Sequence, residues 1–248
     1  MTSRRALRAM VRLNVMRLRR DRFLLQAGVL LLVFGVSMRW GMPWLRDELL
    51  AREAIDIAPY FPLGASYFVL VNASLFAGLL GGLLSLETRE ERTLVALRVS
   101  PVPLMAHLGI TLALTYVVAL SFSLVQAPIL AVGHPGGLAI LVAAALGAPT
   151  GVIYALLLTA LARDKLEAFA VFKLFGIAGL VPIVAFFAPT PWQYVAGVWP
   201  PYWACKVWWL AAREDPQWGT FAGAGLGVSA LWLIALLRRT LRTFRRAT

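Results

Sequence analysis

The uncharged stretch from Val99 to Ala162 constrains the fold more than any other feature of this sequence. A helix needs about 20 residues to cross the hydrocarbon core of a bilayer, which is about 30 Å thick. The stretch is far too long for one crossing, and its glycine- and proline-rich run GHPGG, at Gly133 to Gly137, is typical of a turn. It therefore predicts two membrane spans, over residues 104–132 and 138–162, joined by a tight turn.

The composition of the whole chain is that of an integral membrane protein. Of its 248 residues, 60% are hydrophobic and 15% are charged, and the mean hydropathy is +0.76, whereas soluble domains carry about 25% charged residues. Apolar runs predict four further spans, over residues 23–43, 61–86, 168–188 and 219–237, with Arg39 close enough to the end of the first to snorkel to the interface. We therefore predict an all-α integral membrane protein, one transmembrane domain over residues 1–248 with six transmembrane helices.

Lysine and arginine gather on one side of the predicted spans. They number 24 against 12 acidic residues, and most lie near the two termini and in the segments at 87–103 and 163–165. The positive-inside rule then places both termini in the cytoplasm, with residues 238–248 as a basic tail. Because the charge follows topology rather than a soluble face, it predicts no nucleic-acid partner.

The first 22 residues are basic and amphipathic, which predicts an interfacial helix on membrane lipids. Its arginines, among them Arg8, Arg12 and Arg19, would face lipid headgroups or a partner protein. The alternative is that they only set the topology, and the two roles are compatible.

Prolines and aromatic residues crowd the segment 189–218 on the predicted outer side. Prolines cut it into pieces too short to cross a membrane, so we predict an outer re-entrant or interfacial hairpin. It would serve as an outer gate on a substrate path or as an interface anchor. The candidate gate residues are Trp192, Tyr194, Trp199, Tyr202 and Trp203, with Pro182 and Lys173 of the fifth span as further candidates. For Lys173 we prefer snorkelling to the interface over contact with a substrate, and for Pro182 a structural kink.

No constellation for catalysis or metal binding is visible. The three lysines Lys165, Lys173 and Lys206 follow aspartate, phenylalanine and cysteine rather than the glycine of a phosphate-binding loop. His107 and His134 have no neighbouring ligands, and the lone Cys205 excludes multi-cysteine sites. We expect no catalytic residue, no metal and no cofactor on this chain.

Glycines at a spacing of four predict close helix packing in the membrane. They are Gly78 and Gly82 in the second span and Gly219, Gly223 and Gly227 in the sixth. Packing within the chain and packing against a second chain use the same spacing, so both remain open.

The charged segment 87–103 interrupts the apolar pattern between the second and third spans. Thr88 and Glu91 have the spacing of a capping box, and Ser100 and Pro101 end the run that follows. We therefore predict a short cytoplasmic helix. Its acidic face, with Leu94 and Leu97 one or two turns on, would suit a partner that offers basic groups and an apolar groove, and the alternative is a merely solvated loop helix.

The run from Thr88 to Pro101, TREERTLVALRVSP, resembles the signature of type 2 ABC transporter permeases. Arg92 and Val95 stand where that signature usually has glycine and glutamate. The layout of the chain is also similar, and the stretch from Pro189 to Trp209 looks most like bacterial drug-export permeases of the fluoroquinolone-exporter type.

This resemblance implies the permease subunit of an ATP-driven exporter in the bacterial cytoplasmic (inner) membrane. A separate nucleotide-binding ATPase subunit would carry ATP and Mg, and a second permease half, identical or different, would complete the path. The substrate would be a lipophilic or amphiphilic, drug-like or lipid-like compound. Residues 87–103 would be the coupling helix, with the ATPase contacted by Glu87, Glu90, Glu91, Thr93, Leu94, Leu97 and Pro101. Haem-exporter permeases are the alternative within this class, a non-transport membrane scaffold is one outside it, and a membrane-embedded enzyme is disfavoured.

Overall fold

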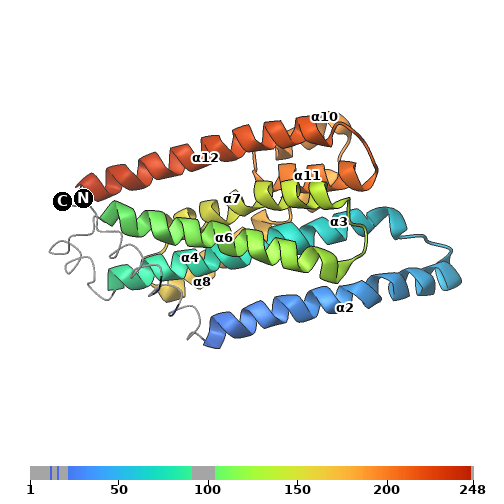
Figure 1. The fold of residues 1–248 in the computed structure, drawn as a ribbon, viewed down its shortest axis with the longest axis horizontal. Helices are drawn as coiled ribbons and strands as arrows, with labels where there is room; N and C mark the ends of the chain where they lie inside the picture. Colours follow the sequence, from blue (N-terminus) through green and yellow to red (C-terminus); the bar gives the residue numbers. More distant parts are fainter. Residues whose placement is uncertain (1–11, 13–15, 17–21, 91–103, 247–248) are drawn as a thin grey trace.

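A computed structural model describes residues 12, 16, 22–90 and 104–246 of the chain. Within these residues all regular structure is helical, and six helical segments are long and apolar enough to cross a membrane (Figure 1). The prediction of an all-α membrane protein with six spans is confirmed. Helix α2 begins and α12 ends at the same end of the bundle, which we call the terminal end. The opposite end is called the hairpin end.

The six spans contain more helical pieces than spans, because two of them are irregular. In chain order the elements are α2 (Arg22–Glu53), the 3-10 turn η1 (Ala58–Tyr60), α3 (Phe61–Ser66), the π-helix η2 (Tyr67–Val71), α4 (Asn72–Glu90), α6 (Leu104–Leu130), α7 (Gly137–Leu161), α8 (Lys165–Ala178), α9 (Val181–Phe187), α10 (Thr190–Ala196), α11 (Pro201–Ala212) and α12 (Trp218–Arg246).

Helix α7 lies at the centre of the bundle and packs against α4, α6, α11 and α12. Its closest neighbour is α4, because two glycines let the backbones approach. A Cβ at Gly78 would clash with the Cβ of Tyr154 and lie 3.0 Å from the carbonyl oxygen of Gly151, and one at Gly82 would clash with Leu158. Small residues at such contacts are typical of helix pairs in membranes. This contact fixes the core around which the other spans pack.

The predicted packing glycines of the sixth span are not at close helix contacts within the described chain. A Cβ at Gly219, Gly223 or Gly227 would meet nothing within 4 Å in the described chain, so these three make no close contact within it. The close approach of α12 to the hairpin occurs instead at Gly225, where a Cβ would lie 2.5 Å from Trp203.

The first span extends well past its predicted end at residue 43. Helix α2 continues through Pro43 to Glu53, and an ion pair between Arg52 and Glu48 joins successive turns of the extension. Arg39 does not only snorkel: its guanidinium donates to the carbonyl oxygens of Pro128 and Ile129 at 3.3 Å. Those carbonyls belong to the last turn of α6, where a cation is favoured by the helix dipole.

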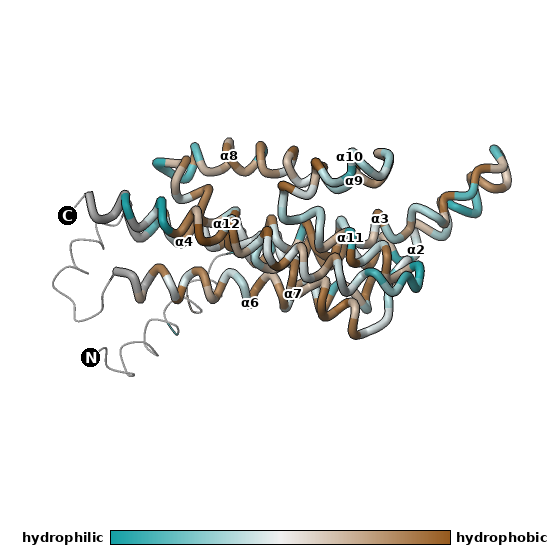
Figure 2. The backbone as a smooth tube through the Cα atoms, turned by 90° about the horizontal axis from the view of Figure 1, so that it is seen from above, coloured by the Kyte–Doolittle hydropathy of each residue, from teal (hydrophilic) through white to brown (hydrophobic). Residues whose placement is uncertain are grey.

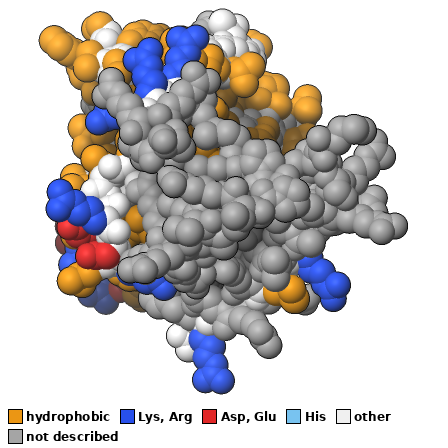
Figure 3. Space-filling model, turned by 90° about the vertical axis from the view of Figure 1, so that its left-hand side faces the viewer, with side chains coloured by type: hydrophobic (Ala, Val, Ile, Leu, Met, Phe, Trp, Pro, Cys, Tyr) orange, Lys and Arg blue, Asp and Glu red, His pale blue; other side chains and the backbone are white. Residues whose placement is uncertain are grey.

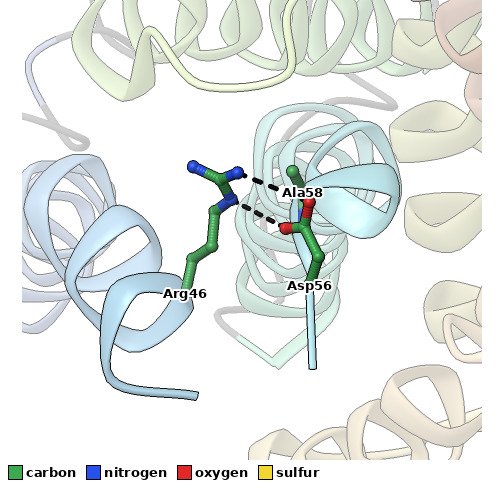
Figure 4. A network of polar contacts seen from close by, with 3 residues as sticks. All are labelled: Arg46, Asp56 and Ala58. Carbon is green, nitrogen blue, oxygen red and sulfur yellow. Dashed lines mark hydrogen bonds and ion pairs between the residues drawn. The ribbon is translucent and has the colours of Figure 1, made fainter. Parts of the chain in front are cut away.

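A polar clasp joins the end of α2 to the start of the second span (Figure 4). Arg46 Nε donates to Asp56 Oδ1 at 2.7 Å, and the amide of Ala58 donates to the same oxygen at 3.0 Å. The hydrogen bond from Arg46 and then that from Ala58 lower the pKa of the Asp56 carboxyl below its ordinary value. The clasp therefore needs an ionised Asp56.

The fifth span is broken rather than continuous. Helix α8 ends at Ala178, Gly179 and Leu180 form a turn, and α9 starts again with Pro182 near its first position, where proline costs no hydrogen bond. Figure 2 shows α8, α9 and α10 in one row along one face of the bundle, with apolar residues frequent in α8. This row borders the candidate functional site.

Candidate functional site

The aromatic hairpin formed by α10 and α11 enters the helix bundle instead of lying across its end. Its tip, residues 197–200, carries Trp199, whose ring lies 5.9 Å from Tyr154 and 5.3 Å from Trp232, centroid to centroid. Trp232 is about 20 Å along α12 from Trp218, at about 1.5 Å per residue. The tip therefore reaches deep into the bundle, which favours the re-entrant one of the two predicted arrangements.

Two indole groups stabilise the unwound backbone at the tip. Pro200 and Pro201 have no N–H groups, so they cannot donate to the carbonyls one turn earlier. Instead, Trp203 Nε1 donates to the carbonyl oxygen of Gly197 at 2.7 Å, and Trp232 Nε1 donates to that of Val198 at 2.8 Å. Backbone polar groups without partners are costly at this depth. The two tryptophans thus allow a non-helical turn inside the helix bundle.

Helix α11 is buried in the hairpin end and tied to its neighbours. Trp208 Nε1 donates to the carbonyl oxygen of Gly133 at 2.9 Å, and Trp209 Nε1 donates to Ser66 Oγ at 2.8 Å. Gly133 has φ of +60°, and a Cβ there would lie 2.5 Å from the carbonyl carbon of Phe61. These two tryptophans are buried donors that join α11 to the α6–α7 turn and to α3.

The predicted gate residues fall into two groups. Tyr202 and Trp203 are buried and Trp199 is half-buried, so these three belong to the packed part of the hairpin. Trp192 and Tyr194 are exposed, with Trp192 at 68%. The hairpin therefore presents one aromatic side to the bundle and another outward.

An aromatic line crosses the middle of the bundle. Phe175 of α8 stacks on Tyr154 of α7 at 5.0 Å, Tyr154 meets Trp199 edge to face, and Trp199 meets Trp232 of α12. Tyr154 Oη and Trp199 Nε1 approach each other, yet neither makes a hydrogen bond of standard geometry within the described part of the chain. Sequence reasoning missed Tyr154, Phe175 and Trp232, because nothing in three separate apolar runs signals that they meet at one tip.

A recess of about 660 Å³ opens between the fifth span and α10. Ile177, Val184 and Ala188 line one side, and Trp192, Val195 and Trp199 line the other. Pro182 is buried at the start of α9 beside this recess, whereas Lys173 is exposed on α8 and does not line it. The structure therefore brings Trp192 and Trp199 together and leaves Lys173 apart.

On the side away from the recess, a lysine joins the two arms of the hairpin. Lys206 Nζ of α11 donates to Gln193 Oε1 of α10 at 2.8 Å and lies 5.7 Å from the ring centre of Phe221. Gln193 in turn donates to the carbonyl oxygen of Ala188 at 2.8 Å. These contacts hold α10 against α11 and α12.

The predicted coupling helix is only partly within the described residues. Helix α4 continues to Glu90, so Thr88 lies inside it and does not cap a new helix. Glu87 accepts a hydrogen bond from Lys165 Nζ at 2.7 Å, which joins α4 to the start of α8. The remaining predicted contacts Glu91, Thr93, Leu94, Leu97 and Pro101 lie outside the described residues.

Exposed basic side chains surround the terminal end, as Figure 3 shows for that face. Arg22, Arg163 and Lys165 are among them. Of the predicted interfacial arginines, Arg12 is helical and exposed, and Arg8 and Arg19 lie outside the described residues. In the described ranges no three His, Cys, Asp or Glu side chains are grouped so that they could hold a metal ion.

Comparison with known proteins adds a family to this geometry. Residues 14–237 match the family described as "Fluoroquinolones export permease protein Rv2686c-like". The chain is 29% identical over 234 residues to the fluoroquinolones export permease proteins Rv2686c and MT2760 of two Mycobacterium tuberculosis strains, H37Rv and CDC 1551 / Oshkosh. Each match covers 93% of this chain and 92% of the relative. The chain therefore belongs to the Rv2686c-like family of export permeases.

Proposed function

We propose that this chain is the membrane subunit of an ATP-driven exporter that moves lipophilic or amphiphilic aromatic drugs, fluoroquinolones among them, out of the cell. The observation that carries the proposal is the family match over residues 14–237, together with the substrate in the relatives' names. The six span-length helices and the recess with apolar, aromatic walls beside the hairpin support it. Such walls suit a lipophilic compound.

The energy source in this proposal is a separate ATPase subunit at the terminal end. The resemblance of the segment from Thr88 to Pro101 to the type 2 ABC permease signature supports this partner. Exposed basic residues such as Arg163, next to the end of α4, add groups for a protein contact at the same end. ATP and Mg belong to the partner.

The terminal end is the cytoplasmic end in this proposal, and the membrane is the bacterial inner membrane. The excess of arginine there supports this orientation. A second permease half completes the transporter, and the face of α12 with Gly219, Gly223 and Gly227 offers small residues to it, since no described residue of this chain covers them.

Co-purification tests the partnership. A tagged chain is isolated from its native membrane in mild detergent, and bound subunits are identified by mass spectrometry. The wild type should bring down an ATPase subunit, and a Glu90→Lys, Leu94→Asp variant should lose it. The matched control is Asp47→Lys, a charge reversal of an exposed residue near the hairpin end, which should keep the ATPase. Absence of an ATPase from the wild type would instead favour the scaffold hypothesis.

A further inference from the structure

The recess between the fifth span and α10 is open in the part of the chain that the structure describes. Val184 on one wall is 70% exposed, and Trp192 and Val195 on the other are 68% and 64% exposed. None of the lining side chains is charged. The recess is therefore an apolar space between two walls of the same chain, and it reaches from the outer part of the hairpin to its tip at Trp199.

The volume of the recess and the aromatic rings in its walls indicate which kind of molecule fits. Its volume of about 660 Å³ is within the range of about 300–1,000 Å³ common for sites of drug-sized ligands. Two indole rings, Trp192 and Trp199, offer flat surfaces, and aromatic rings favour offset-stacked or edge-to-face contacts with one another. A lipid tail would fill the apolar space but would gain nothing from these ring contacts.

The inner end of the recess is formed by Trp199. Its Nε1 is buried and approaches Tyr154 Oη, which does not line the recess. A ligand in the recess therefore meets the ring of Trp199 rather than its N–H.

We propose that this recess is the site where the chain binds an amphiphilic molecule by its flat aromatic ring system, held between Val184 and the two tryptophans Trp192 and Trp199. The inference rests on the proposed export function and assigns that function a place. Because Trp199 is also joined to Tyr154 and Trp232, a molecule in the recess touches the tip that reaches the centre of the bundle.

The test measures binding of radiolabelled norfloxacin to the full-length chain in nanodiscs of phosphatidylethanolamine and phosphatidylglycerol. Norfloxacin has a flat bicyclic ring with a ring carbonyl, and at neutral pH it also carries a carboxylate and an ammonium group, which the uncharged recess would leave at its open side. Val184→Trp and Val195→Trp each fill the recess from one wall, and both residues are exposed, so the variants should fold. The matched control is Leu174→Trp, which adds the same side chain at a position of α8 that is 62% exposed and outside the recess.

We expect each recess variant to weaken norfloxacin binding by at least about tenfold and the control to stay within about twofold of the wild type. Unchanged affinity in both recess variants would overturn the proposal, and so would a wild type that binds no norfloxacin. Native mass spectrometry that finds the recess filled by a lipid which norfloxacin does not displace would also overturn it.

Export assays separate this inference from the function on which it rests. If cells carrying Val184→Trp or Val195→Trp export norfloxacin as well as the wild type does, the site is wrong while the export function stands. If the wild type neither binds nor exports norfloxacin, both fail.

Discussion

The hydrogen bond from Trp203 to the hairpin tip predicts a measurable loss of stability. Trp203→Phe keeps an aromatic ring but removes the Nε1–H that lies 2.7 Å from the carbonyl oxygen of Gly197. Pro201, one turn later, has no N–H to replace it. An unsatisfied buried carbonyl costs about 1–3 kcal/mol, and the smaller ring leaves a void in a position where Trp203 is only 9% exposed. We expect a total loss of about 2–3 kcal/mol.

Thermal unfolding in detergent, followed by circular dichroism, measures this loss. At about 2–4 °C per kcal/mol the midpoint should fall by roughly 4–12 °C. Trp192→Phe is the matched control, because Trp192 is 68% exposed and makes no such bond in the described structure, and it should change the midpoint by about 1–2 °C at most. Equal midpoints for the two variants would refute the idea that indole donors stabilise the tip.

Three further predictions follow from the fold. Gly78→Ala should lower the unfolding midpoint because its Cβ clashes with α7, whereas Gly223→Ala, with open space around it, should leave the midpoint unchanged or raise it. The pKa of the Asp56 carboxyl is lowered in the folded state, so the ionised carboxylate stabilises the fold above the ordinary pKa of 3.8, and this stabilisation is lost as the pH falls through the folded pKa. The difference in unfolding midpoint between the wild type and Asp56→Asn should therefore be constant above about pH 5 and disappear in acid. A membrane-impermeant maleimide added to intact cells should label Asp215→Cys and not Arg163→Cys. The background should be low because the single native cysteine is buried. The reverse labelling pattern would show that the proposed orientation is wrong.

The spans could be predicted from sequence because uninterrupted apolar length is a direct physical requirement for crossing a bilayer. The turn at residues 133–137 was also predictable, since glycine and proline mark it. The end of α2 could not be predicted. Pro43 and the charged residues after it suggest that the helix ends there, yet it continues to Glu53. The ion pair between Arg52 and Glu48 lies within this extension, and the Arg46–Asp56 clasp joins it to the second span.

The presence of the hairpin could be predicted from the sequence, but how far it reaches into the bundle could not. Its prolines and tryptophans fit an interfacial pair of helices as well as a re-entrant one, and the difference lies in two long-range hydrogen bonds. Trp232 donates to Val198, thirty-four residues away in the sequence, and Trp209 donates to Ser66 in the second span. No local pattern encodes such partners, because they depend on how the spans pack.

The glycine pattern shows the same limit. The spacing of Gly78 and Gly82 is the same as that of Gly219 and Gly223, but the first pair is in tight contact with α7 and the second is open. Spacing identifies a smooth helix face, and only the packing of the spans shows whether another helix of the same chain covers it.

Transport into inverted membrane vesicles tests the central claim most directly. Vesicles from cells that contain the chain and its native membrane partners are given norfloxacin with ATP or with ADP, and accumulated drug is measured after rapid filtration. We predict accumulation that requires ATP and disappears from vesicles of cells lacking only this chain. Accumulation that is the same without the chain, or the same with ADP, would contradict an ATP-driven export permease.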